Sequence, residues 1–180
     1  MARLSSGRKK SEVRKFIREE LRLLHETDFV AYIEPFTWRV ERDGTGLLYV
    51  PSLATFERLT PDATPTGVVM RDGSFMAVKL VVRFDYPDGV GRSTSASREP
   101  CIVYVEYSFH YQRPQDCTFF RYDFHPHIGD PRTHPIFHVH AAGWQRGDKQ
   151  LPDKPRLPSS SMTLSEVLDV VRMNYFTEEA

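Results

Sequence analysis

The chain has 180 residues, of which 40% are hydrophobic and 27% charged, as in an ordinary globular domain. Lysine plus arginine and aspartate plus glutamate both number 24, and the resulting zero net charge argues against a general nucleic-acid coat protein. No apolar run approaches about 18 residues and none follows the basic N-terminus, so the sequence predicts neither a membrane span nor a signal peptide. The two cysteines are expected to be reduced core residues, and we therefore expect a cytoplasmic protein with no membrane partner.

The chain begins with a basic stretch and an amphipathic helix. Residues 1–10 are predicted to form a flexible basic arm, and residues 11–180 a single domain. A helix is expected from about Ser11 to Glu26, because apolar residues recur there at helical spacing on one stripe. Its basic residues lie mostly off that stripe. They could bind along the phosphate backbone of a nucleic acid, but a run of charges is more often a face exposed to solvent. The stripe consists of Val13, Phe16, Ile17, Leu21 and Leu24.

The middle of the chain has the pattern of an antiparallel sheet. Residues 29–40 and 47–50 flank a glycine-containing turn and predict a hairpin. Further strands are expected where β-branched and aromatic residues alternate between short turns, and such neighbours should pair antiparallel. A short helix is predicted near residues 52–59, and loops are predicted over 87–100 and 147–161. The further predicted strands span residues 67–70, 76–86, 102–111, 117–124 and 134–142.

A second helix is predicted near the C-terminus. Thr163 and Glu166 have the Thr-x-x-Glu spacing of a capping box, in which each residue accepts a hydrogen bond from the other's backbone. Apolar residues at helical spacing follow this box. Together these elements predict an α+β fold: a single domain in which an antiparallel sheet of about five to six strands carries the N-terminal and C-terminal helices on one face.

Five of the chain's seven histidines lie between His125 and His140. Histidine changes charge near neutral pH and is the commonest metal ligand, whereas a buried imidazole needs partners for two nitrogens. This density marks the segment as the first candidate for a functional site. Because alternate residues of a strand point to the same face, His138 should project together with His140, and Arg121 together with Asp123.

If the two strands pair, an arginine, a carboxylate and several imidazoles gather on one polar face that is backed by aromatic residues. Glu106 of the preceding strand could join this face, but a solvated position is the simpler interpretation. We predict the catalytic residues to be Arg121, Asp123, His125, His138 and His140. The residues expected to bind substrate are His127, His134 and Arg156.

Three interpretations of this patch remain open. The preferred one is metal-free acid–base cleavage of RNA, in which one imidazole removes the 2′-hydroxyl proton and another protonates the leaving oxygen. Arg121 would then stabilise the phosphorane, and Asp123 would orient an imidazole. The second interpretation is a metal-dependent hydrolase that uses the His-x-His segment, with zinc, iron or nickel as the ion. The third is a non-enzymatic accessory or binding module whose histidines form an interface. The sequence does not specify a cofactor.

The C-terminal half resembles the TumE-type toxin family of bacterial toxin–antitoxin systems over about residues 100–176. The resemblance rests on a long aromatic strand, a Phe-Arg-Tyr-Asp segment, a His-x-His pair and a closing helix of Leu-x-Glu-Val-Leu character. It implies a small growth-inhibiting protein with RNA as a candidate target and an antitoxin as its partner. The matching positions carried over by the resemblance are Arg121, Asp123, His138, His140 and, less directly, His125. We therefore expect a toxin-like protein, with ribonuclease as its candidate activity.

Overall fold

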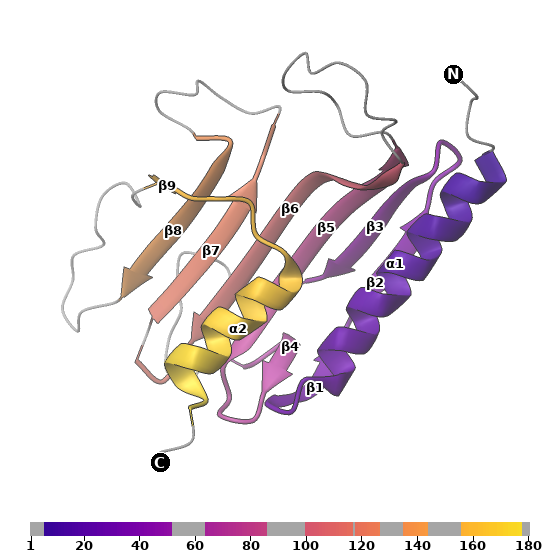
Figure 1. The fold of residues 1–180 in the computed structure, drawn as a ribbon. Coiled ribbons are helices and arrows are strands. Elements are labelled where there is room, and N and C mark those ends of the chain that lie inside the picture. The colour runs from indigo at the N-terminus through magenta and orange to yellow at the C-terminus, as the bar shows by residue number, and fades with distance from the viewer. Residues whose placement is uncertain are drawn as a thin grey trace.

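The sheet and its two helices are seen in a computed structural model that describes residues 6–51, 64–85, 100–116, 118–126, 135–143 and 156–177. In this part of the chain nine strands form one antiparallel sheet, and both helices lie on the same face of it (Figure 1). The predicted α+β class and the position of the helices are confirmed. The strand number exceeds the predicted five to six, because the strand predicted over residues 29–40 divides into two short strands. In addition, a strand of three residues at the sheet edge is too short to give an alternating pattern.

The order of the strands in the sheet differs from their order in the chain. The main path runs β1-β4-β5-β6-β7-β8-β9, while β3 pairs with β5 beside β4 and β2 pairs with β3. Each of these pairs is antiparallel. The helices are α1 (Ser6–Glu26) and α2 (Leu164–Tyr175). The strands are β1 (Val30–Glu34), β2 (Thr37–Val40), β3 (Thr45–Val50), β4 (Gly67–Met70), β5 (Phe75–Asp85), β6 (Cys101–Arg113), β7 (Thr118–Phe124), β8 (Phe137–Gly143) and β9 (Arg156–Pro158).

Helix α1 packs its predicted apolar stripe onto β3 and β5. It begins at Ser6, so the second half of the predicted basic arm is helical. Val13 and Ile17 are fully buried, and burial of a side chain of this size contributes roughly 1.5–3 kcal/mol. Gly46 of β3 permits this close packing, because a Cβ atom there would collide with both of these side chains.

Helix α2 begins with the predicted capping box, which is confirmed. The Glu166 backbone N–H donates to Thr163 Oγ1 at 3.2 Å, and the Thr163 backbone N–H donates to Glu166 Oε2 at 2.7 Å. At the other end of the helix, Arg172 forms an ion pair of 2.8 Å with Asp28, just before β1. This ion pair joins the C-terminal helix to the N-terminal part of the sheet. The residues of α2 buried against the sheet are Leu164, Val167, Leu168 and Val171.

Some local predictions are confirmed, and others need correction. The predicted hairpin is present as β2 paired with β3, but the first half of its predicted strand over residues 29–40 forms β1, which pairs with β4 instead. The loop predicted over residues 147–161 contains the short edge strand β9, whose three residues are too few to be recognised from sequence. Cys101 is exposed at the start of β6, so the prediction that it is a core residue is wrong. The Cys117 side chain and the helix predicted near residues 52–59 lie outside the described residues. Neither helix in the described ranges is long and apolar enough to cross a membrane.

The two faces of the sheet have different chemical characters. The face under the helices carries the aromatic core of β6, formed by Tyr107, Phe109 and Tyr111. Residues at alternate positions face the other way, so the register pairs polar residues across the sheet on the side away from the helices. We call this side the polar face. One row across β5, β6, β7 and β8 consists of Lys79, Ser108, Asp123 and His138.

Candidate functional site

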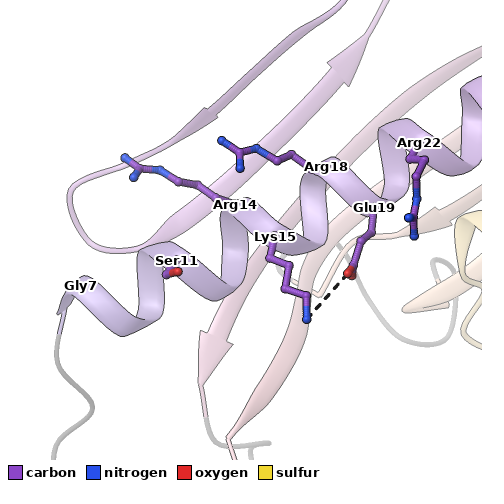
Figure 2. Close-up of a pocket in the computed structure, with 7 residues that line it drawn as sticks. All are labelled: Gly7, Ser11, Arg14, Lys15, Arg18, Glu19 and Arg22. Atoms are coloured by element: carbon purple, nitrogen blue, oxygen red, sulfur yellow. Dashed lines mark ion pairs between the residues drawn. The ribbon is translucent and has the colours of Figure 1, made fainter.

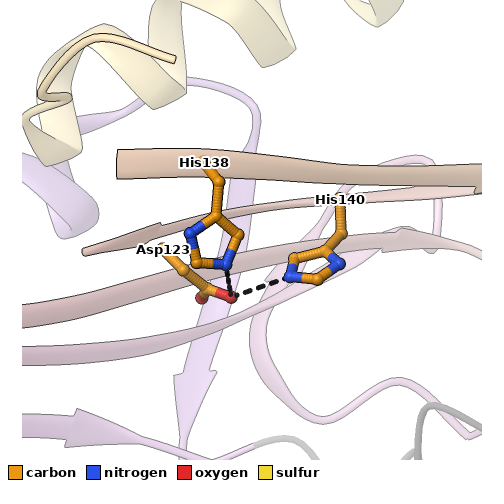
Figure 3. A group of neighbouring side chains, drawn as sticks. All are labelled: Asp123, His138 and His140. Atoms are coloured by element: carbon orange, nitrogen blue, oxygen red, sulfur yellow. Dashed lines mark ion pairs between the residues drawn. The ribbon is translucent and has the colours of Figure 1, made fainter. Parts of the chain in front are cut away.

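The candidate site is built on the paired strands β7 and β8. Asp123 lies directly opposite His138, and Arg121 lies directly opposite His140. Directly opposed residues in an antiparallel pair project to the same side, so these four side chains share the polar face. Figure 3 shows Asp123, His138 and His140 projecting from the sheet away from α2, with both imidazoles turned toward the carboxylate.

The Asp123 carboxylate is the centre of the cluster. Its Oδ2 atom lies 3.5 Å from His138 Nε2, 3.4 Å from His140 Nε2 and 2.6 Å from Arg121 Nε. Its other oxygen, Oδ1, lies 3.8 Å from His125 Nε2. Four of the five predicted catalytic residues therefore converge on the fifth.

The five residues differ in their access to solvent. Asp123, His138 and His140 expose only 1%, 0% and 5% of their surface, and we call them the buried triad. The side chains of Arg121 and His125 are 23% and 18% exposed, and we call these two residues the rim. A large substrate would meet the rim first, with the buried triad acting from beneath it.

Asp123 is ionised at neutral pH despite its burial. Burial by itself raises the pKa of this carboxyl group, because desolvation disfavours the charged form. The contact with His140 and the charge of Arg121 outweigh this effect, with smaller contributions from Ser108 and His125, and together they lower the pKa to about 2. The buried carboxylate is therefore negatively charged at neutral pH and is paired with the Arg121 guanidinium.

The orientation of His138 is fixed by the backbone. Its Nδ1 atom lies 2.7 Å from the carbonyl oxygen of Pro135. Because a carbonyl oxygen only accepts hydrogen bonds, Nδ1 must carry the proton. In a neutral imidazole this leaves the lone pair on Nε2, which faces Asp123. The atoms that the three members of the buried triad offer lie within 4.8 Å of one another, an arrangement that could hold a metal ion.

Glu106 belongs to the site, although the sequence favoured a solvated position for it. Its Oε1 atom lies 3.2 Å from His125 Nδ1 and 2.5 Å from Lys79 Nζ. His125 therefore lies between two carboxylates, those of Glu106 and Asp123. Strand alternation places Glu106 on the same face as Ser108, which the sequence can predict. The register between β6 and β7, which the sequence does not specify, brings Glu106 near His125.

The predicted substrate-binding residues have different positions. Arg156 lies opposite His140 on the edge strand β9 and is exposed, so it flanks the cluster. His127 and His134 lie outside the described residues. Among the described residues, Arg156 is thus the predicted substrate-binding residue that lies beside the cluster.

A separate basic groove runs along α1. Figure 2 shows Arg14 and Arg18 extending toward one side of the helix, while Lys15 and Glu19 form an ion pair on the other. Because α1 covers the opposite face of the sheet, this groove is not continuous with the histidine cluster. The groove is lined by Gly7, Ser11, Arg14, Lys15, Arg18, Glu19 and Arg22.

The fold and the cluster define a single-domain α+β protein with a histidine and carboxylate site on its helix-free sheet face. Comparison with protein families shows a match to the family described as Toxin TumE over residues 53–174. The chain belongs to the TumE toxin family, which makes it a toxin-like protein. No curated protein and no solved structure matches the chain significantly.

The family match is longer than the resemblance visible in the sequence, which covered about residues 100–176. It includes the strands from β4 onward and α2, and therefore the whole candidate site. Helix α1 and strands β1, β2 and β3 precede it. The basic groove thus belongs to a part of the fold that the family match does not cover.

Proposed function

We propose that this toxin cleaves RNA and that the polar face of β6, β7 and β8 is its reaction centre. The observation that carries the proposal is the position of a partly exposed imidazole, His125, between the carboxylates of Glu106 and Asp123 and beside the Arg121 cluster. An imidazole held in this way is placed to exchange a proton with a bound substrate. Membership of a toxin family supports an activity that damages a cellular target.

In the proposed reaction the rim residues act on the RNA, and the buried triad supports them from beneath. His125 removes the proton from a ribose 2′-hydroxyl, whose oxygen then attacks the adjacent phosphorus. The bond between phosphorus and the 5′-oxygen breaks, the leaving oxygen takes a proton from water, and a 2′,3′-cyclic phosphate remains. Arg121 stabilises the negative charge on the phosphorane, as a guanidinium can donate two hydrogen bonds to phosphate oxygens. Asp123, with His138 and His140 around it, contacts both rim residues from beneath. Arg156, exposed on β9, binds a flanking phosphate.

Glu106 is a positioning residue in this proposal. Its carboxylate contacts His125 Nδ1, and its ion pair with Lys79 anchors it to β5. A carboxylate at this position favours the tautomer with the proton on Nδ1, which leaves a lone pair on Nε2 to act as the base. The expected effect of Glu106→Gln is a loss of rate with little change in substrate affinity.

The test compares wild-type protein and His125→Ala on a labelled single-stranded RNA. General acid–base catalysis by one side chain is typically worth about 10²–10⁴-fold, so the variant should cleave at least roughly 100-fold more slowly. The same sequence with 2′-O-methyl groups should not be cleaved by either protein, because its attacking hydroxyl is blocked. Cleavage by His125→Ala at the wild-type rate would contradict the proposal.

The matched control is His25→Ala, which removes an exposed histidine from α1 on the other face of the sheet. This variant should cleave RNA and arrest bacterial growth as the wild type does. If growth arrest requires His125 but no RNA is cleaved, the site acts on a target other than RNA. We further propose that the protein acts in the cytoplasm and is neutralised there by an antitoxin protein.

A further inference from the structure

We infer that Asp123, His138 and His140 form a binding site for a zinc ion. Zinc binding goes beyond the proposed function, because it does not require RNA to be the target. Two imidazoles and one carboxylate are a ligand set that zinc uses in proteins, with a fourth position taken by water or substrate. All three residues lie on β7 and β8, where regular strand pairing determines their spacing.

The two distances from the Asp123 carboxylate to the imidazoles suit a tetrahedral ion. With bonds of about 2.0–2.1 Å, a tetrahedral zinc site separates its ligand atoms by roughly 3.3 Å. The Asp123 Oδ2 atom lies 3.5 Å from His138 Nε2 and 3.4 Å from His140 Nε2. Shifts of a few tenths of an ångström would therefore complete these two edges. An octahedral ion of the same bond length would need a shorter separation of about 3 Å.

The surroundings of the ligands also favour a metal. Nδ1 of His138 donates to the Pro135 carbonyl oxygen, which is the contact that commonly orients a zinc-binding imidazole. When the His138 imidazole is neutral, its Nε2 lone pair faces the Asp123 carboxylate, and a cation between the two atoms would bind both. Neither nitrogen of His140 has a hydrogen bond of good geometry among the described residues, although both are buried. A zinc ion would be coordinated by His138 Nε2, Asp123 Oδ2 and one nitrogen of His140 together.

Arg121 competes with the metal for the same oxygen. Its Nε atom lies 2.6 Å from Asp123 Oδ2, and a divalent cation bound to that oxygen would repel the guanidinium group. The Arg121 side chain is 23% exposed and can turn toward solvent. Zinc binding should therefore release Arg121 from Asp123, and removal of Arg121 should strengthen zinc binding. Substitution of Asp123 should weaken zinc binding, whereas substitution of Arg121 should strengthen it. General capture of metal by histidines would not produce these opposite effects.

The test uses the full chain, purified without a histidine tag, stripped of metal and titrated with zinc. The wild-type protein should bind one equivalent of zinc, and its melting temperature should rise by several degrees. Asp123→Asn and His140→Gln, which keep approximate side-chain size, should weaken zinc binding by about 100-fold or more, since even outer contacts of a metal site are worth 10–100-fold. Arg121→Ala should bind zinc more tightly than the wild type.

Two controls locate the ion. His25→Ala and the double variant His127→Ala/His134→Ala should bind zinc like the wild type, because they remove histidines outside the triad. Cobalt(II) bound to the wild-type protein should give the intense visible absorption of a tetrahedral complex, a readout that remains if a triad variant fails to fold. A wild-type protein that binds no zinc, gives no such band, or loses zinc only in the double variant would overturn the inference.

Discussion

Asp123 of β7 and His138 of β8 are directly opposed across the sheet, with 3.5 Å between Oδ2 and Nε2, and both side chains are 0% exposed. An ionised carboxylate and an imidazole rarely occupy such a buried position without close partners. Asp123 also contacts the rim residues Arg121 and His125, so the buried pair and the partly exposed residues share one carboxylate. Its loss should therefore affect the stability of the protein as well as its activity.

We predict that Asp123→Ala lowers the free energy of unfolding by about 3 kcal/mol, because it removes the buried carboxylate that Arg121, His138 and His140 contact. The measurement is urea unfolding at neutral pH. The control is Asp169→Ala, which changes an exposed aspartate on α2 and should alter the unfolding free energy by no more than about 0.5 kcal/mol. Equal effects of the two substitutions would show that the buried carboxylate does not stabilise the fold.

A second prediction concerns Glu20 on α1. Burial, followed by the neighbouring charge of Glu19, raises the pKa of the Glu20 carboxyl group to about 7 from an ordinary value of 4.5. A group whose folded-state pKa is raised stabilises the fold below its unfolded pKa, and this stabilisation is lost as pH rises through 7. Glu20→Gln should thus match the wild type near pH 4.5 and exceed its stability at pH 8 by up to roughly 3 kcal/mol.

Thermal or urea unfolding at several pH values between 4.5 and 8 would measure this difference. Glu26→Gln, at an exposed position of the same helix that pairs with Arg22, is the matched control. Its stability relative to the wild type should change little over the same range, since exposed ion pairs are worth at most about 1 kcal/mol. A Glu20→Gln variant without pH-dependent stabilisation would mean that the Glu20 carboxyl group is solvated in the folded protein.

A third prediction concerns the packing of α1 on the sheet. In Gly46→Ala the added Cβ would collide with Val13 and Ile17, and overpacking of this kind typically costs about 1–3 kcal/mol. Gly7→Ala is the control, because no atom lies within 4 Å of the added Cβ and alanine has the higher helix propensity. Unfolding experiments should give a large loss for Gly46→Ala and none for Gly7→Ala.

A fourth prediction concerns the start of α2. Thr163→Ala removes the side-chain acceptor of the capping box and should cost about 1 kcal/mol of stability. Thr163→Ser retains the hydroxyl group and should remain within about 0.5 kcal/mol of the wild type. If Thr163→Ser loses as much stability as Thr163→Ala, the Thr163 methyl group rather than the capping hydrogen bond is responsible.

Local periodicity was enough to predict much of the fold. The stripe that includes Val13 and Ile17 predicted α1, and the Thr163 to Glu166 spacing predicted the cap of α2. Alternation along a strand also placed His138 with His140, because it depends only on residues two apart in the same chain segment. Short strands such as β9 escaped prediction, since three residues carry no measurable period.

The sequence alone determined which side chains share a face of each strand, and it narrowed the site to one histidine-rich segment. Only the tertiary structure decided which residue lies opposite which: the register sets Asp123 against His138 and brings Glu106 to His125. It also decided that the triad is buried while the rim reaches solvent. Register and burial depend on pairings between distant segments, which are selected by the packing of the whole sheet against its helices and leave no signal in any one segment.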